Sequence, residues 1–222
     1  MGHFIELTAA DGHRFQAWVT QPAGTPRGAL VVVQEIFGVN SHIRAVTDGY
    51  AADGYLAIAP ALFDRVQRGF ETGYTPEDIQ TGIALMQKAS MDGAMLDVQA
   101  CLAHVAGAGK AGITGYCWGG TVAWVAASRV AGLACSIPYY GGGIHANIAA
   151  QPMCPVMFQF AERDRSPTIA QAREIAAAHP QAVTHVYPAD HGFNCDQRGS
   201  YDAASATLAR QRSLQFLATH VG

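Results

Sequence analysis

Short stretches of strand-like and helix-like hydrophobic patterning alternate along most of this chain. Residues 3–8 and 13–20 carry partly alternating apolar side chains on either side of an Asp-Gly turn signal, which predicts a β-hairpin. The run ALVVVQE at 29–35 is apolar and rich in valine until its last two residues, as expected of a strand covered on both faces. The same reasoning predicts further strands at 55–60, 111–116, 133–141, 155–164 and 183–188.

Apolar residues at helical spacing fill the segments between these strands. Segment 75–89 has the clearest start, because Thr75 suits an N-cap, Pro76 suits the first helical position and two acids follow in the first turn. Gly54 marks the end of an earlier helix. Helices are therefore predicted at 42–54, 75–89, 95–106, 121–130, 168–179 and 200–221.

The alternation of strands and helices from residue 29 onward predicts the α/β class. We expect a mostly parallel central sheet with helices on both faces, and the N-terminal hairpin as an antiparallel edge. No repeat, linker or low-complexity stretch interrupts the pattern. Residues 1–222 are therefore expected to form a single domain.

Composition narrows the range of functions. Of the 222 residues, 50% are hydrophobic and 14% are charged, which suits a large core and excludes a disordered chain. The net charge of -3 and the scattered basic residues argue against nucleic acid as a partner. No apolar run approaches the ~20 residues of a membrane helix, and the N-terminus lacks the features of a signal peptide. We therefore expect a cytoplasmic protein with no membrane partner.

The cysteine pattern differs from that of a disulfide framework or a structural zinc site. The chain has five cysteines, an odd number, and no two are spaced as Cys-x-x-Cys. We expect most of them to be reduced and buried without a metal, with one of them free to be reactive. They are Cys101, Cys117, Cys135, Cys154 and Cys195.

Cys117 stands out because it lies between Gly115 and Gly119, after a predicted strand and before a predicted helix. This is the G-x-nucleophile-x-G elbow of the α/β-hydrolases, with cysteine in the place of serine. Glycines on either side let the turn pack closely against the neighbouring strand and helix. A position at the start of a helix also favours the thiolate.

Asp164 and His191 follow later predicted strands, and the order nucleophile, acid, histidine is the one that the α/β-hydrolase fold uses. In that arrangement the histidine takes the proton of the nucleophile and the aspartate orients the imidazole. Each residue alone has an ordinary interpretation: a core cysteine, a loop carboxylate, and one of nine histidines. His145 is the other candidate for the base. The hypothesis of a catalytic triad therefore depends on the order of Cys117, Asp164 and His191 along the chain, each after a predicted strand.

Glu35 ends the buried strand at 29–35, where a carboxylate is costly unless it is paired. The alternative is an ordinary exposed loop carboxylate. In this fold the loop after that strand supplies one oxyanion donor, and the residue after the nucleophile supplies the other. We therefore expect the backbone N–H groups of Ile36 and Trp118 to form an oxyanion hole.

At these positions the chain resembles the dienelactone hydrolase (carboxymethylenebutenolidase) family. The resemblance rests on the stretches VVVQEIFGVNSHIRAVTDGYAADGYLAIAPALF, GITGYCWGG, YYGGG, AERD and YPADHGF. It implies an α/β-hydrolase fold and hydrolysis of a lactone or ester by Cys117, His191 and Asp164, with no metal or cofactor. It also matches Glu35 to a glutamate beside the nucleophile. This suggests that Glu35 accepts a hydrogen bond from the resting thiol until an anionic substrate displaces it.

The sequence departs from the family where substrate arginines are expected. Arg198 is the nearest arginine after the histidine, and Arg65 and Arg68 are the candidates in the earlier loop. Solvated loop charges are the alternative interpretation of these arginines. Tyr139 is a further candidate for the cavity wall. The predicted partner is a small ester or lactone, anionic if the arginines serve it, bound by a monomer or small homo-oligomer.

Two other classes of function remain open at this point. The chain could be a non-catalytic ligand-binding protein on a hydrolase scaffold, in which case the triad or the oxyanion loop should be damaged. It could also be a thiol redox protein, which needs a resolving cysteine. Cys195, four residues after His191, is the candidate for that role.

Overall fold

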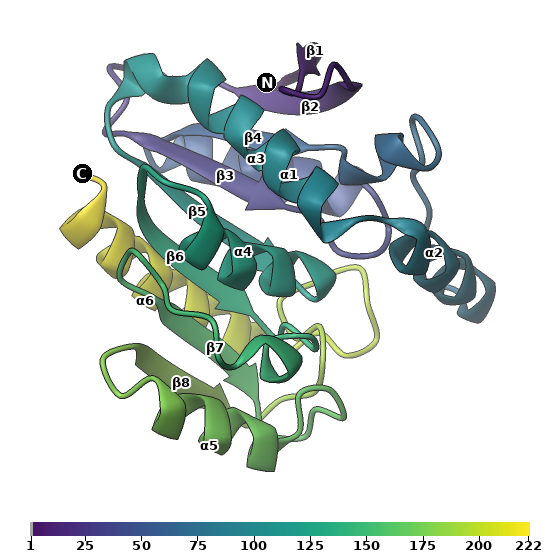
Figure 1. Cartoon of the computed structure of the whole chain (residues 1–222). Helices are drawn as coiled ribbons and strands as arrows, with labels where there is room; N and C mark the ends of the chain where they lie inside the picture. Colours follow the sequence, from purple (N-terminus) through teal and green to yellow (C-terminus); the bar gives the residue numbers. More distant parts are fainter. Residues whose placement is uncertain (1) are drawn as a thin grey trace.

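The chain folds around one eight-stranded sheet in a computed structural model that describes residues 2–222 (Figure 1). The strand order is β1-β2-β4-β3-β5-β6-β7-β8. β1 and β2 form an antiparallel hairpin, β2 pairs antiparallel with β4, and the other neighbours are parallel. The strands are β1 (His3–Thr8), β2 (Arg14–Thr20), β3 (Ala29–Val33), β4 (Leu56–Pro60), β5 (Ala111–Tyr116), β6 (Leu133–Tyr139), β7 (Met157–Ala161) and β8 (Val183–Tyr187).

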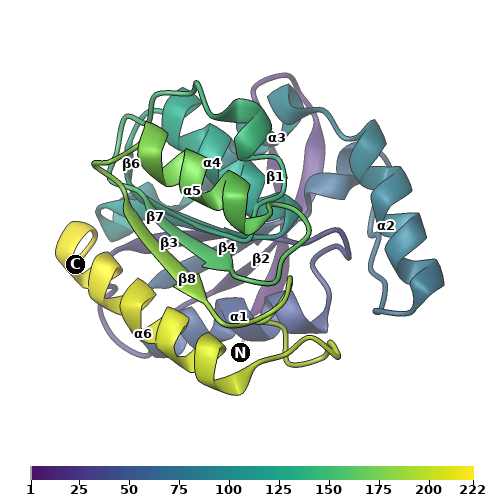
Figure 2. The same ribbon diagram turned by 90° about the horizontal axis from the view of Figure 1, so that it is seen from below.

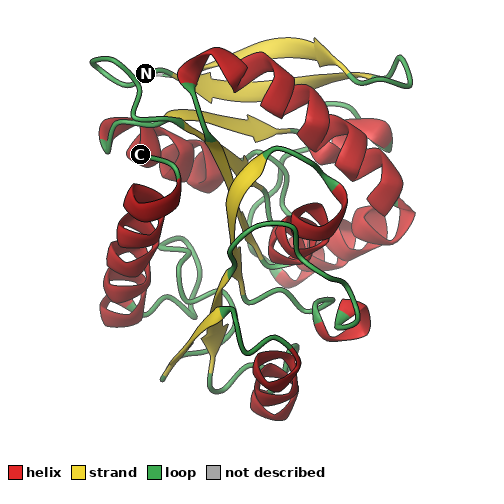
Figure 3. Ribbon diagram, turned by 60° about the vertical axis from the view of Figure 1, so that its left-hand side comes forward, coloured by secondary structure: helices red, strands yellow, loops and turns green. Residues whose placement is uncertain are grey.

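Helices cover both faces of the sheet, as the sequence pattern predicts. Figure 2 shows α4 and α5 on one side of the strands and α1 and α6 on the other, and Figure 3 shows the twist of the sheet between them. The helices are α1 (Ser41–Ala52), α2 (Pro76–Lys88), α3 (Met91–Val105), α4 (Trp118–Arg129), α5 (Ile169–Ala178) and α6 (Ala203–His220). Three short 3-10 helices are η1 (Leu62–Arg65), η2 (Ala106–Ala108) and η3 (His145–Asn147). Within residues 2–222, no helix is long and apolar enough to cross a membrane.

The valine-rich strand β3 explains why both faces need cover. Val31 and Val33 belong to the apolar cluster beneath α3, α4 and α5, while Leu30 and Val32 belong to the cluster beneath α1 and α6. Successive side chains of a strand point to opposite faces, so an uninterrupted apolar run buries both. This confirms the interpretation of β3 as a strand buried on both sides.

Two element boundaries differ from the sequence prediction at the edge that carries the candidate site. β3 ends at Val33, so Gln34 and Glu35 lie in the following loop. α4 begins at Trp118, directly after Cys117, rather than at residue 121. A side chain on Gly119 would come within 2.4 Å of the Gln34 carbonyl oxygen, so only glycine lets the first turn of α4 pack so closely on the end of β3.

Helix α2 lies at the side of the sheet, beyond the carboxyl ends of the strands (Figure 1). Its start is as predicted, because the Thr75 side chain accepts a hydrogen bond from the Asp78 N–H and Pro76 is the first helical residue. Gly82 faces the loop after β3, where an added Cβ would lie 2.3 Å from the Ile36 carbonyl oxygen. A glycine in α2 thus lets this helix rest directly on the loop that follows β3.

Candidate active site

Cys117 occupies a strained turn between β5 and α4. Its backbone has φ 57° and ψ -118°, a conformation that a residue with a side chain rarely adopts. The Cys117 N–H donates to the Tyr139 carbonyl oxygen at 3.1 Å, which ties the turn to β6. A Cβ on Gly115 would come within 2.0 Å of the Gly119 carbonyl oxygen. The turn therefore requires the glycine, and it presents the thiol at the start of a 12-residue helix.

Asp164 and His191 are joined by a hydrogen bond at the same edge of the sheet. His191 Nδ1 lies 2.8 Å from Asp164 Oδ2, and the other carboxylate oxygen accepts the Ser166 N–H at 2.8 Å. The Asp164 side chain is buried, while 26% of the His191 side chain is exposed. Because Nδ1 is bound to the carboxylate, Nε2 is the ring nitrogen left for another partner.

The electrostatics of His191 link it to Cys117. Burial opposes a positive charge on the imidazole. The negative charge of the Cys117 thiolate and hydrogen bonds with Asp164 and Cys117 outweigh burial, and they raise the pKa of His191 to about 10. A histidine with this pKa is a strong base toward a neighbouring thiol and, once protonated, a proton donor beside the nucleophile.

A cavity of about 700 Å³ opens at this edge of the sheet. It is large enough for a small-molecule ligand. Six of the residues singled out from the sequence line it: Cys117, Asp164, His191, Ile36, Trp118 and Arg198. Trp118 is the first residue of α4, and the first N–H groups of a helix have no partner within it. The cavity thus brings together a thiol, a His–Asp pair and a helix start that can donate hydrogen bonds.

Glu35 lies at the margin of this site and is 1% exposed. Its Oε1 accepts a hydrogen bond from Arg198 Nη1 at 3.2 Å, and the Arg198 guanidinium also lies over the Phe37 ring, 5.5 Å from its centroid. Among residues 2–222, Glu35 Oε2 is buried without a hydrogen-bond partner. The buried carboxylate is therefore paired, as its place after β3 demands, but with Arg198 rather than with the Cys117 thiol that the sequence suggested.

The structure does not bring Arg65 and Arg68 to the cavity, contrary to our expectation for the substrate arginines. Arg65 donates to Asp97 from two nitrogens, both at 2.8 Å, and to Asp11 at 2.7 Å. Arg68 donates to Glu6 at 2.6 Å. Both arginines are engaged with carboxylates, and Arg65 is held because the buried Asp97 needs a cation beside it.

Tyr139 is also placed elsewhere than expected. It is fully buried on the opposite face of the sheet, where its hydroxyl lies 2.7 Å from Ser213 Oγ. The next residue, Tyr140, has φ 34°, and its ring packs edge-to-face with the His191 ring, with the two centroids 5.0 Å apart. The rival base, His145, has its Nε2 2.6 Å from Glu174 Oε2 near the surface and does not line the cavity.

Several residues that line the cavity were not singled out in the sequence. Ile79, Ile83 and Met86 form one face of α2, and their spacing of four and three residues is the signal that could have identified them. Arg163 and Arg165 flank Asp164 at the rim. Arg163 is paired with Asp190, which also lines the cavity, so Arg165 is the rim arginine without that partner.

The mostly parallel sheet and the functional side chains at its carboxyl edge define an α/β-hydrolase. The model of the dienelactone hydrolase family matches residues 15–221. The chain belongs to that family, and it is a hydrolase of the kind that acts on esters or lactones.

Individual relatives agree with this assignment. A carboxymethylenebutenolidase from Pseudomonas putida is 31% identical over 227 residues, which cover 96% of this chain and 95% of that protein. A candidate carboxymethylenebutenolidase from Synechocystis sp. is 37% identical over 214 residues, 86% of each chain. The crystal structure of a candidate dienelactone hydrolase from Klebsiella pneumoniae subsp. pneumoniae MGH 78578 matches with a TM-score of 0.80 at 30% identity, covering 97% of this chain and 99% of that one.

Proposed function

We propose that this protein is a cysteine-dependent hydrolase of small carboxylic esters or lactones, acting in the cytoplasm without a metal or cofactor in the reaction. The observation that carries the proposal is the pairing of His191 with Asp164 at 2.8 Å in the cavity that Cys117 also lines. The strained backbone of Cys117 and the pKa of His191, about 10, add support, because both are typical of an activated nucleophile and its base.

The proposed reaction has two halves. The Cys117 thiolate attacks the carbonyl carbon, a carbon–sulfur bond forms, and the carbonyl oxygen becomes an oxyanion held by the N–H groups of Ile36 and Trp118. The carbon–oxygen bond to the leaving group then breaks, and His191 gives its proton to the departing oxygen. Water, losing a proton to His191, attacks the thioester, the carbon–sulfur bond breaks, and the carboxylic acid leaves the Cys117 thiolate beside the protonated His191, as at the start. With a lactone, both products are parts of one molecule.

Glu35 has a proposed regulatory role beside Cys117. We propose that Glu35 accepts a hydrogen bond from the neutral thiol in the resting enzyme, where its charge opposes thiolate formation. An anionic substrate would repel the Glu35 carboxylate toward Arg198. The Cys117 thiol could then give its proton to His191. The ion pair between Glu35 and Arg198 in the structure is the arrangement expected after that movement. The variant Glu35→Ala should make the resting thiol react faster with iodoacetamide, and an unchanged rate together with unchanged turnover would contradict this role.

A burst experiment tests the catalytic proposal. The purified protein should release about one equivalent of p-nitrophenol per chain from an activated ester before steady turnover begins, because a thioester accumulates. Cys117→Ala should lose both the burst and the turnover. Cys154→Ser is the matched control, since Cys154 is half-buried and does not line the cavity. No burst from folded protein with intact Cys117 would favour a non-catalytic ligand-binding protein.

A substrate panel tests the substrate class. Anionic esters and lactones should be hydrolysed with higher kcat/KM than neutral analogues of the same size, because Arg165 and Arg198 line the cavity, whereas Arg163 is paired with Asp190. A preference for neutral substrates would contradict both the arginine recognition and the role of Glu35. Mass spectrometry after mild peroxide treatment tests whether the chain is a thiol redox protein. That alternative requires a disulfide between Cys117 and Cys195, and its absence would exclude the alternative.

A further inference from the structure

A second group of ligand-type side chains lies behind Glu35, separate from the Cys117–His191–Asp164 group. Glu35, His42 and Cys195 each offer one atom, and these three atoms lie within 4.8 Å of one another. All three residues are buried, at 1%, 3% and 0% exposed. They come from the loop after β3, from the first turn of α1, and from the loop between β8 and α6. Three distant segments therefore converge on one buried point.

Two of the three groups have lone pairs that nothing in the protein uses. Within residues 2–222, Glu35 Oε2 and His42 Nε2 are both buried without a hydrogen-bond partner. Such unpaired polar atoms are costly, and each one calls for a physical reason. Arg198 binds the other carboxylate oxygen, Oε1, and so leaves Oε2 free.

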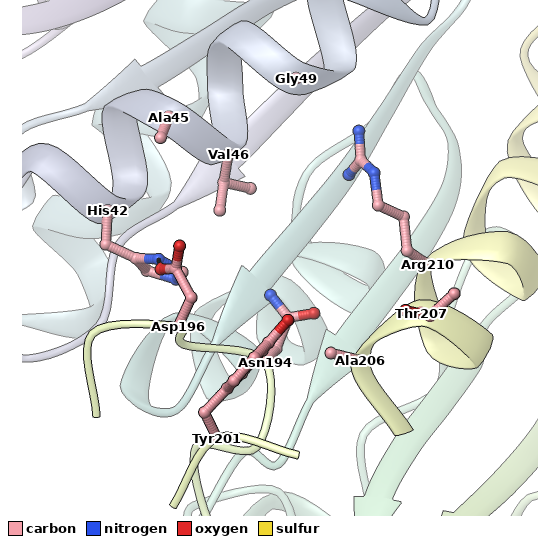
Figure 4. Close-up of a pocket in the computed structure, with 10 residues that line it drawn as sticks. All are labelled: His42, Ala45, Val46, Gly49, Asn194, Asp196, Tyr201, Ala206, Thr207 and Arg210. Carbon is pink, nitrogen blue, oxygen red and sulfur yellow. Dashed lines mark hydrogen bonds and ion pairs between the residues drawn. The ribbon is translucent and has the colours of Figure 1, made fainter. Parts of the chain in front are cut away.

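The histidine in this group is oriented as metal-binding histidines are. His42 Nδ1 lies 3.1 Å from Asp196 Oδ1, so this nitrogen faces a carboxylate as a donor, and in the neutral ring the lone pair lies on Nε2. Figure 4 shows His42 beside Asp196 at the wall of a second cavity, of about 290 Å³, which is also lined by α1 and the start of α6. The Asp196 side chain is 65% exposed, so the carboxylate that holds His42 can be changed without disturbing the core.

We propose that Glu35, His42 and Cys195 bind a divalent ion of the zinc class through Oε2, Nε2 and Sγ. One thiolate, one imidazole and one carboxylate form a donor set suited to Zn²⁺ or Co²⁺ and unsuited to Mg²⁺ or Ca²⁺. A tetrahedral zinc ion holds such atoms about 3.5 Å apart, so the present group has to contract by roughly an ångström. Three protein ligands leave the fourth position to water. The site uses Glu35 in its position beside Arg198, so an ion bound there would hold the carboxylate away from the Cys117 thiol.

Binding is balanced by the loss of one proton. The Cys195 thiol gives its proton to solvent, and the thiolate, the Glu35 carboxylate and neutral His42 then hold the ion. The two negative ligands match the two positive charges of the ion. Arg198 adds one positive charge nearby and Asp196 one negative charge at the far side of the imidazole. Occupancy therefore does not leave an unbalanced charge at the buried point.

The test uses Co²⁺ as an optical probe in the Cys117→Ser variant, where the catalytic thiol cannot contribute. One equivalent of Co²⁺ per chain should produce the near-ultraviolet absorption band of a cobalt–thiolate bond, and Zn²⁺ should abolish the band at one equivalent. In the Cys117→Ser background, Cys195→Ser should lose the band and Cys154→Ser should keep it. A band that persists without Cys195, or no band in the folded Cys117→Ser protein, would overturn the proposal.

A variant at an exposed position tests the same proposal without the risk that a substitution in the core unfolds the protein. Asp196→Asn changes an exposed side chain, and it removes the carboxylate that orients His42. The variant should keep the circular dichroism spectrum of the parent while its Co²⁺ dissociation constant rises about tenfold or more. An unchanged dissociation constant would contradict the proposed role of His42. His42→Gln should weaken binding more than Asp196→Asn does, since it removes a ligand rather than its support.

Discussion

The molecule contains two groups built from the same residue types, and they differ in what the fold does with the cysteine. Cys117 lies on a strained turn at the start of α4, partly accessible, beside a histidine whose pKa is raised to about 10. Cys195 is fully buried, and burial together with the Glu35 charge raises the pKa of its thiol to about 11. The first environment places a strong base beside an accessible thiol, whereas the second keeps the thiol neutral unless a cation compensates its charge.

The two histidines are similarly oriented, which sharpens the contrast. His191 and His42 each bind a carboxylate through Nδ1, at 2.8 Å from Asp164 and 3.1 Å from Asp196. In one group Nε2 is available to a thiol that opens on a cavity. In the other Nε2 is buried close to a second carboxylate. The presence of a cysteine, a histidine and a carboxylate therefore does not by itself determine whether the cysteine acts as a nucleophile or as a metal ligand. Backbone conformation and access to solvent determine which role it takes.

The largest expected effect separates the two cysteines by activity. Cys117→Ala should lower kcat/KM for an activated ester on the order of 10⁴-fold or more, since the thioester can no longer form. Steady-state kinetics on the parent, this variant and Cys154→Ser measures the effect. Cys154→Ser should stay within about twofold of the parent, as a substitution outside the site normally does. A decrease in kcat/KM of less than tenfold for Cys117→Ala would show that Cys117 is not the nucleophile that distinguishes the first group from the second.

Alkylation should separate the same cysteines by roughly 100-fold. The pKa of Cys195, about 11, lies about two pH units above that of an ordinary thiol, which means about 100-fold less thiolate near neutrality, before its burial is considered. Cys117 should therefore be labelled first by iodoacetamide, as peptide mass spectrometry can follow over time. Equal rates at the two positions would show that burial does not protect Cys195.

The ionisation of His191 should depend on Cys117. The thiolate charge is the main influence that raises the pKa of His191, so Cys117→Ser should move that pKa from about 10 toward its ordinary value near 6.5. Titration of the imidazole proton resonances by nuclear magnetic resonance measures this shift. Asp164→Asn should lower the pKa by less, because it removes a smaller contribution.

The raised pKa of His191 also predicts how the stability and the activity of the protein depend on pH. A histidine whose pKa is raised on folding stabilises the protein fully below its unfolded pKa, near 6.5, and loses that contribution as the pH rises through about 10. Turnover that needs the imidazolium as a proton donor should fall over the same upper range. Activity that stays constant to pH 11 in stably folded protein would argue against this protonated form.

The smallest expected effects concern the arginines near the two groups. Arg198 is mostly buried and charge-paired, so Arg198→Met should lower kcat/KM for an anionic ester about tenfold relative to its neutral analogue. Arg165 is exposed at the rim, and Arg165→Met should change the same ratio by about threefold at most. The ratio of the two substrates corrects for general loss of activity. Equal effects would mean that burial does not strengthen recognition by Arg198.

Local patterns predicted much of the fold because local physics determines them. The valines of β3 required cover on both faces, and Thr75 with Pro76 fixed the start of α2. The start of α4 was missed because its first turn contains Gly119 and Gly120, which are poor helix formers. Glycines are needed at these two positions because of tertiary packing, since the first turn of α4 lies directly against the backbone of β3 and β6.

The residues around the candidate site were predictable only where sequence order fixes position. The order of Cys117, Asp164 and His191 follows the strands, so the shared edge of the sheet could be inferred. Arg65 could not be assigned, because nothing local reveals that buried Asp97 holds it. Tyr139 could not be excluded from the cavity wall, because nothing local reveals that its hydroxyl is held by Ser213 on the far face of the sheet.

The contact between Gly82 and the Ile36 carbonyl has a consequence for how this protein can change over evolution. Only two residues of α2, Gly82 and Leu85, are buried, yet Ile79, Ile83 and Met86 of the same helix line the cavity. Substitutions at those three positions would alter which molecules fit while leaving the sheet and its turn intact. New substrate ranges can therefore arise by exchanging one helix face, provided that position 82 stays small.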